Sequence, residues 1–201
     1  ATCVMNFEGA QGWLVGEPNQ GLRCMFTMMN SARWMVGLQG LGIAEGAYQI
    51  SLGFARERLQ SRSLSGPKAA DKPADPIIVH PDVRRNLLRQ KVMIEGCRAL
   101  AYFTGLQADL AHSHDDPAVR QQADDLVQLL TPVVKSFLTE EGFNCANHGL
   151  QVLGGSGYTE DWGIEQLVRD SRITLIYEGT NGIQGLDLVG RKLGLGGGRA
   201  V

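Results

Sequence analysis

Three long apolar stripes at helical spacing constrain the fold of this chain more than any other feature of its sequence. In residues 41–59, 83–101 and 119–137, apolar side chains recur on one helical face, three, four or seven positions apart. Each stripe needs an apolar partner, and such helices can cover one another in an antiparallel bundle. The sequence therefore predicts a mostly α-helical protein. The expected long helices lie near residues 21–60, 82–112 and 117–152.

Capping and breaking residues indicate where these helices begin. Pro81 suits the first helical position, and Asp116 before Pro117 is a typical N-terminal cap. A polar linker with three prolines, residues 61–80, separates the first two helices. A short helix is expected after Thr159, where acidic residues favour the positive end of a helix.

The two ends of the chain differ from the middle. Residues 2–15 are β-prone and broken by Gly9 and Gly12, which indicates two short strands without a sheet of their own. The chain opens without Met, so we expect a segment of a longer protein. A last helix is expected from Thr180 or Asn181. The predicted division is a β segment over 1–20, a helical bundle over 21–193 and a flexible tail over 194–201. The apolar residues of the last helix are Ile183, Leu186 and Leu193.

Composition excludes several classes of function. The 201 residues carry a formal net charge of −2, which argues against binding to nucleic acid or to an anionic membrane. No apolar run approaches the length of a membrane span. The four cysteines are scattered without a C-x-x-C pair, as expected for a reduced, cytoplasmic protein. His112 and His114 are two positions apart and would not share a helical face, so no metal site is predicted.

Glycines interrupt the first predicted helix. Gly42, Gly46 and Gly53 should each cost about 1 kcal/mol relative to Ala. Such a cost indicates a close helix approach or a ligand. The segment Gly37-Leu-Gln-Gly-Leu-Gly42 lacks the spacing and the preceding strand of a dinucleotide-binding loop, so it is interpreted as helix packing.

The candidate site is the sequence Tyr177-Glu-Gly-Thr180. It places the Glu178 carboxylate between an aromatic ring and a Gly-Thr turn, just before an apolar helix. A carboxylate held partly out of water on such a turn is a candidate general base. Taken alone, the same Glu could simply be a solvated acid at a helix start. A second motif upstream, Gln151-Val-Leu-Gly-Gly-Ser-Gly157, could be a turn between helices or a place where backbone approaches a phosphate or a flavin.

Together the two motifs resemble those of acyl-CoA dehydrogenases. The resemblance runs from the first residues to about Lys192. It implies that residues 1–20 end the middle β-domain of that family and that the rest is its C-terminal helical domain. Residues 64–68 and 76–85 resemble the larger bacterial members, of the 3-methylmercaptopropionyl-CoA dehydrogenase type.

The resemblance implies α,β-desaturation of an acyl-CoA thioester. Glu178 would remove the α-proton, FAD would accept the β-hydride, and the isolated chain would be inactive. Arg58 would pair with the FAD pyrophosphate, for which a guanidinium is well suited. The glycine motif would meet the FAD of a neighbouring subunit. The implied cofactor-binding residues are Arg58, Gln151, Gly154, Gly155 and Thr180, and the implied substrate-binding residues are Arg33, Tyr177 and Gly179.

Arg33 has two interpretations. It could pair with an acid near a helix start, or it could lie near the CoA site. Some branched-chain members of the family place the catalytic Glu just before this Arg. Ala32 occupies that position here and cannot act as a base, which favours Glu178.

The implied partners are an acyl-CoA substrate, an electron acceptor such as electron-transfer flavoprotein, and further copies of the chain in a homodimer or homotetramer. Two other interpretations stay open at this point. One is a non-enzymatic helical-bundle module that binds a partner, and the other is an acyl-CoA oxidase, which shares the catalytic Glu.

Overall fold

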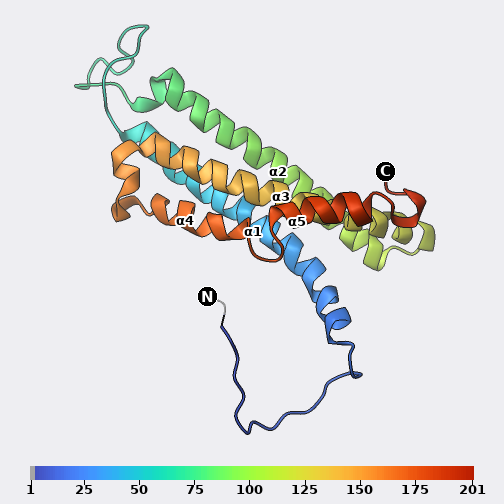
Figure 1. Cartoon of the computed structure of the whole chain (residues 1–201). Helices are drawn as coiled ribbons and strands as arrows, with labels where there is room; N and C mark the ends of the chain where they lie inside the picture. Colours follow the sequence, from blue (N-terminus) through green and yellow to red (C-terminus); the bar gives the residue numbers. More distant parts are fainter. Residues whose placement is uncertain (1–2) are drawn as a thin grey trace.

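Three long helices form the body of the protein, as a computed structural model shows for residues 3–201 (Figure 1). They are α1 (Gly21–Glu57), α2 (Pro81–Ser113) and α3 (Pro117–Leu153). α1 and α3 run in the same direction, and α2 runs opposite to both (Figure 1). α3 packs against every other α-helix of the described chain. This confirms the predicted helical bundle.

The predicted caps begin the helices. Pro81 occupies the first turn of α2, and Pro117 the first turn of α3. The Asp116 side chain accepts a hydrogen bond of 2.8 Å from the Ala118 N–H. An N-cap of this kind satisfies one of the amide groups that a helix start leaves free.

Short elements complete the bundle after α3. α4 (Ile164–Thr174) and α5 (Asn181–Asp187) lie against α3, and α4 also contacts α1. The Thr180 side chain caps α5, which begins at Asn181, one of the two starts that the sequence predicted. The remaining short elements are η1 (Ile77–Val79), η2 (Gly154–Tyr158), η3 (Glu160–Trp162), η4 (Leu188–Lys192) and η5 (Leu195–Gly197).

The core consists of two apolar clusters along the bundle. One joins α1, η1, α2, α3 and α4 near the end of α3, and the other joins α1, α2 and α3 farther toward the middle. The fully buried Ile164 at the start of α4 belongs to the first cluster, and Leu138 of α3 belongs to the second.

α1 and α3 touch through glycines. A Cβ atom on Gly40 would lie 2.5 Å from the Leu138 carbonyl oxygen, and one on Gly142 would lie 2.6 Å from the Gly40 oxygen. The interpretation of residues 37–42 as a packing segment is therefore confirmed. The prediction of a close helix approach was wrong for Gly42 and Gly53, because a Cβ there would meet no atom within 4 Å. These two glycines face away from α3.

The expected short strands at the N-terminal end are not present. Within residues 3–20 the structure contains no strand, and the segment extends away from the bundle (Figure 1). Its side chains are exposed, including Trp13 at 84%. Strands need neighbours for their backbone hydrogen bonds, and no sheet exists within residues 3–201 to supply them.

The linker, residues 58–80, is ordered around one buried carboxylate. Asp75 is fully buried and accepts hydrogen bonds from the N–H groups of Ser63 (2.9 Å), Lys68 (2.8 Å) and Ala69 (2.8 Å). Arg62 adds an ion pair of 3.2 Å. The hydrogen bond from Ser63, with those from Ala69, Lys68 and Arg62, holds the pKa of Asp75 well below its ordinary range against the opposing effect of burial.

The C-terminal residues return to the bundle. Arg199 donates to both carboxylate oxygens of Asp125 on α3, at 2.9 and 3.3 Å. None of the helices in residues 3–201 has the length and apolar character needed to cross a membrane.

Candidate active site

Glu178 lies on a tight turn, residues 175–180, that joins α4 to α5. Its φ is +54°, and that of Gly179 is +85°. Left-handed backbone is costly for a residue with a side chain and persists only where the surroundings impose it. Gly179 cannot carry a side chain here, since a Cβ would lie 2.8 Å from the Gln184 Nε2 atom.

Hydrogen bonds from α5 and to the end of α4 hold this turn. The buried Gln184 amide donates to the carbonyl oxygens of Glu178 (3.3 Å) and Gly179 (3.0 Å). The Thr180 hydroxyl oxygen accepts from the Ile183 N–H at 3.4 Å. The Asn181 N–H donates to the Leu175 carbonyl at 3.1 Å. The backbone of the turn is therefore fixed by hydrogen bonds within α5 and to the end of α4.

The Glu178 carboxylate itself is half-buried and unpaired. Within residues 3–201 it has neither a hydrogen-bond partner nor an ion-pair partner, and its backbone N–H has no acceptor. Both groups are thus available to a ligand. A carboxylate in this state can accept a proton without first breaking an ion pair.

Tyr177 lies next to this carboxylate and is tied to α1. Its hydroxyl donates to the Gln39 side-chain oxygen. Partial burial raises the pKa of Tyr177, and the negative charge of Glu178 raises it further. The ring therefore stays neutral and protonated at physiological pH.

A buried lysine lies beneath the turn. Lys135 of α3 has no exposed surface, and its ammonium group donates to the Asn181 side-chain oxygen at 2.9 Å. Burial lowers the pKa of Lys135 to about 8, the charge of Arg33 acts in the same direction, and the charge of Glu178 opposes both.

Arg33 is engaged at the other end of α5. Its guanidinium forms an ion pair of 3.1 Å with the buried Asp187, and its Nε atom is buried without an acceptor in the described chain. It also lines a pocket of about 280 Å³ together with Asn30 and Asp124. Pairing with an acid is one of the two interpretations that the sequence left open. Contact with substrate stays a prediction.

Three of the predicted cofactor-binding residues come together elsewhere. Arg58, Gly154 and Gly155 line one pocket of about 720 Å³ between the end of α1, the linker and the end of α3. The Arg58 side chain is exposed and has no partner among residues 3–201. Gln151 is exposed on the last turn of α3 and does not line this pocket. The other lining residues include Phe54, Gln60, Ser61, Arg62, Leu64, Ile77, His80, Val83 and Ser156.

The glycines after α3 have different roles. Gly154 ends the helix with φ +60° and ψ −139°, a backbone conformation that only Gly adopts readily. Gly157 is needed for packing, because a Cβ would lie 2.8 Å from that of Leu153. A Cβ on Gly155 would meet nothing within 4 Å. Packing therefore does not require Gly at position 155, and the missing side chain leaves its backbone accessible from the pocket.

The structure does not bring the two predicted sites together in one chain. The Glu178 turn lies beside the middle of α3, at Lys135, whereas the glycine loop follows Leu153. At 1.5 Å per residue, these positions on α3 are about 27 Å apart.

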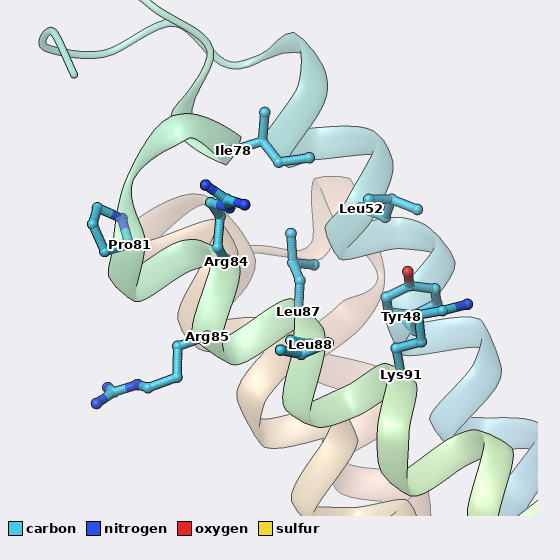
Figure 2. Close-up of a pocket in the computed structure, with 9 residues that line it drawn as sticks. All are labelled: Tyr48, Leu52, Ile78, Pro81, Arg84, Arg85, Leu87, Leu88 and Lys91. Carbon is cyan, nitrogen blue, oxygen red and sulfur yellow. The ribbon is translucent and has the colours of Figure 1, made fainter. Parts of the chain in front are cut away.

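A further pocket, of about 550 Å³, was not predicted. It lies where η1 and the start of α2 cross α1 (Figure 2). Tyr48 and Leu52 come from α1, and Leu87 and Arg84 from α2. It contains none of the predicted site residues.

Sequence reasoning also missed Lys135, Asn181 and Gln184. Lys135 lies inside the third apolar stripe but on a different side of the helix, where only a helix buried on several faces would cover it. Asn181 and Gln184 follow the Glu178 motif directly, and their polar character at positions that face the bundle is the one signal that could have revealed them.

The whole bundle matches a known domain. A family model described as acyl-CoA dehydrogenase, C-terminal domain, matches residues 19–193. The chain is 50% identical to 3-methylmercaptopropionyl-CoA dehydrogenase of Ruegeria pomeroyi over 100% of its own length and 33% of that protein. It is 38% identical to a broad-specificity linear acyl-CoA dehydrogenase of Mycobacterium tuberculosis, covering 96% of the chain and 32% of the relative. The chain thus spans about a third of the length of these relatives.

Solved structures share the fold at lower identity. Butyryl-CoA dehydrogenase from Megasphaera elsdenii aligns with a TM-score of 0.69 and 24% identity, over 87% of this chain and 39% of that one. A Caenorhabditis elegans protein solved in complex with C11-CoA aligns with a TM-score of 0.76 and 21% identity, over 89% and 28%. With a family model that matches residues 19–193, the chain belongs to the acyl-CoA dehydrogenase family, as its C-terminal domain.

Proposed function

We propose that this chain is the helical catalytic domain of a flavin-dependent acyl-CoA dehydrogenase, which introduces an α,β double bond into an acyl-CoA thioester. The observation that carries the proposal is the unpaired, half-buried Glu178 carboxylate on a turn fixed by hydrogen bonds. A helical module that only binds a partner would not need a carboxylate presented in this way. The match of residues 19–193 to the family supports the same conclusion.

Glu178 is the proposed general base. It would remove the proton on the α-carbon of the thioester. That proton becomes acidic enough only when the neighbouring carbonyl is polarised, and the free backbone N–H of Glu178 is the group that could donate to the carbonyl oxygen. The general base and the hydrogen-bond donor then belong to one residue, so a single turn positions both groups.

The residues of the second pocket fit the dinucleotide end of FAD. The free Arg58 guanidinium can bind a pyrophosphate in a bidentate way, and the open backbone at Gly155 allows a close approach. Gly154 and the exposed Gln151 would flank it. When bound, FAD supplies the acceptor for the hydride that leaves the β-carbon. The Thr180 hydroxyl accepts from Ile183 but keeps its own hydrogen, which it could donate toward the flavin.

FAD binding and proton removal are therefore assigned to two separate parts of one chain. A neighbouring copy in a homodimer or homotetramer would bring its Arg58 pocket to the FAD that serves the Glu178 turn. Exposed apolar residues on α2 and α5, such as Phe103 and Leu186, provide surface for such an assembly.

Tyr177 and Gly179 flank Glu178 and are the proposed contacts to the acyl thioester. Arg33 lies beneath the same helix and is proposed to support the CoA side of the site. By analogy with the 50% identical relative, we propose a short acyl-CoA of the 3-methylmercaptopropionyl type as substrate. Electron-transfer flavoprotein is the proposed electron acceptor.

Replacement of Glu178 by Gln in the full-length enzyme tests this function. The amide keeps the size of the side chain and the backbone N–H but cannot take a proton, so kcat should fall by about 10²–10⁴-fold. The KM for acyl-CoA should stay nearly constant, because the lost interaction is made only in the transition state. Glu160→Gln, at an exposed Glu outside the site, is the matched control. Turnover of Glu178→Gln close to that of the control would exclude Glu178 as the base.

A further inference from the structure

The short helix α5 buries its polar side. Asn181, Gln184 and Asp187 recur at a spacing of three and therefore share one face. Gln184 and Asp187 are only 1% and 4% exposed, whereas Leu186 on the opposite side is 70% exposed. The face turned toward the bundle is thus held by hydrogen bonds and charge rather than by apolar packing.

Each end of this polar face meets a cation from a different long helix. Lys135 of α3 donates to Asn181 at the first position of α5. Arg33 of α1 pairs with Asp187 at its last position. Gln184 lies between them and binds the carbonyl oxygens of the Glu178 turn. Polar contacts with α3 and α1 therefore hold the two ends of α5, and Gln184 in the middle of α5 holds the turn that precedes it.

Asn181 is the most heavily connected of these residues. Its side-chain oxygen accepts from Lys135 (2.9 Å) and from the Thr139 hydroxyl (3.3 Å). Its amide nitrogen donates to the Ser136 carbonyl and to the Glu140 carboxylate, both at 3.3 Å. Its backbone N–H closes the turn onto Leu175. The contacts that Asn181 makes with α3 thus position the adjacent residues 177–180.

Stability alone does not account for Lys135. Within residues 3–201 it forms no ion pair, although it has no exposed surface. Burying a charge without a counter-charge is costly, and apolar replacements of buried charges are often neutral or stabilising. Among the described residues its ammonium group has one hydrogen-bond acceptor, the Asn181 side-chain oxygen, so the contact that offsets this cost lies at the start of α5.

We propose that Lys135 is a positioning residue that fixes the left-handed Glu178 turn through its hydrogen bond to Asn181. Lys135 does not itself touch the reacting atoms. It holds the first residue of α5, and thereby the carboxylate and the N–H of Glu178, in place. The kinetic part of this inference rests on the proposed function of Glu178, whereas the structural part does not.

The experiment uses the full-length enzyme with Lys135→Met, which keeps the length of the side chain and removes the charge. Hydrogen exchange is measured on peptides that cover residues 175–187 and, for reference, residues 92–106 of α2. We expect exchange about tenfold or more faster in the first peptide and unchanged exchange in the second, because the opening is local. Lys91→Met, at an exposed lysine of α2, is the matched control and should change neither peptide.

Kinetics give the second measurement. Displacement of a catalytic group by about 1 Å can cost on the order of 10²-fold, so kcat of Lys135→Met should fall about 10- to 100-fold with KM within about threefold. Asn181→Ala should reproduce both changes. Since Lys135 acts through Asn181, the double variant should be no slower than the slower single variant, instead of showing the product of the two losses.

The outcomes are distinguishable. If Lys135→Met leaves both exchange and kcat unchanged, the positioning role is overturned, while Glu178 stands or falls by its own variant. If Lys135→Met does not fold, Asn181→Ala gives the same test, and normal exchange in residues 175–187 of that variant overturns the inference. If Glu178→Gln retains turnover, the proposed function fails, and the exchange data still decide whether Lys135 fixes the turn. Multiplicative losses in the double variant would mean that the two residues act separately.

Discussion

Gly179 is the residue on which the shape of the Glu178 turn depends most directly. Its backbone is left-handed, and the space where a Cβ would lie is taken by the Gln184 amide. The same amide donates to the carbonyl oxygens of Glu178 and Gly179 in the turn. A side chain at this position would therefore remove the hydrogen bonds as well as strain the backbone.

We expect Gly179→Ala to destabilise the protein by about 1–3 kcal/mol, as is typical where a side chain is forced into left-handed backbone. It should also lower kcat, because Glu178 moves with the turn. Gly182→Ala is a matched control, since its Cβ would come no closer than 3.9 Å to a neighbouring atom and its φ is not positive. Urea unfolding of both variants measures the difference. Equal stability would show that Gln184 does not fix the turn.

Candidate residues that form a short motif could be recognised in the sequence, whereas candidate residues that act through packing could not. The sequence pointed to Glu178, Gly179 and Thr180 because they form one short motif. It did not point to Lys135, which lies more than forty residues away in the chain, because its neighbours are brought to it only by the packing of α5 on α3. The left-handed φ of Glu178 was equally invisible, since an ordinary residue type occupies the position.

At the scale of elements, the linker shows how one residue can organise a segment that contains almost no regular structure. Asp75 gathers three backbone N–H groups and Arg62 around itself. Arg62 and its neighbours Gln60 and Ser61 form one wall of the pocket that contains Arg58. The shape of the proposed FAD pocket therefore depends on the ionised form of a carboxylate that does not line it.

This arrangement predicts a pH dependence. The pKa of Asp75 is lowered in the folded protein, so its stabilising contribution is complete above the ordinary Asp pKa of about 3.9 and is lost as pH falls below it. Asp75→Asn should lower stability at pH 7 and should flatten the loss of stability between about pH 5 and 2. Urea unfolding across that range measures both effects. The control is Asp71→Asn in the same linker, at an exposed position. Parallel pH profiles for wild type and Asp75→Asn would contradict the assignment.

The length of an element decided how well it could be predicted. The apolar stripes of α1, α2 and α3 repeat over many turns, so their period is unambiguous and their bounds were expected within a few residues. α5 has seven residues, too few for a clear period. Leu186 is exposed and Gln184 is buried on this helix, because the fold places cations under its polar side.

At the scale of the whole molecule, the main feature is the separation of the two proposed sites. Arg58 and Gly155 lie at one end of the bundle, and Glu178 lies beside its middle. If one FAD needs both, they must come from two copies of the chain. The exposed apolar residues Leu186 and Val189 of the C-terminal elements, each at 70%, and Tyr102 of α2, at 67%, are available to join those copies.

This separation predicts complementation between two inactive variants of the full-length enzyme. Glu178→Gln removes the base, and Arg58→Ala weakens the FAD pocket. In a mixed dimer, one site would combine both substitutions, while the other would combine an intact Glu178 with an intact Arg58 of the partner. Random pairing of two co-expressed variants makes half of the dimers mixed with one working site each, so about a quarter of wild-type activity should return.

The measurement is acyl-CoA-dependent dye reduction by the purified mixture, compared with each variant expressed alone. Separately purified variants that are mixed without exchange of subunits provide the control and should stay inactive. If Glu178 and Arg58 of the same chain served one FAD, every site in a mixed dimer would carry one of the two substitutions, and co-expression would restore nothing. Recovery of activity would support the separation of the Glu178 turn from the Arg58 pocket, which lie beside Lys135 and Leu153 of α3, two positions about 27 Å apart along that helix.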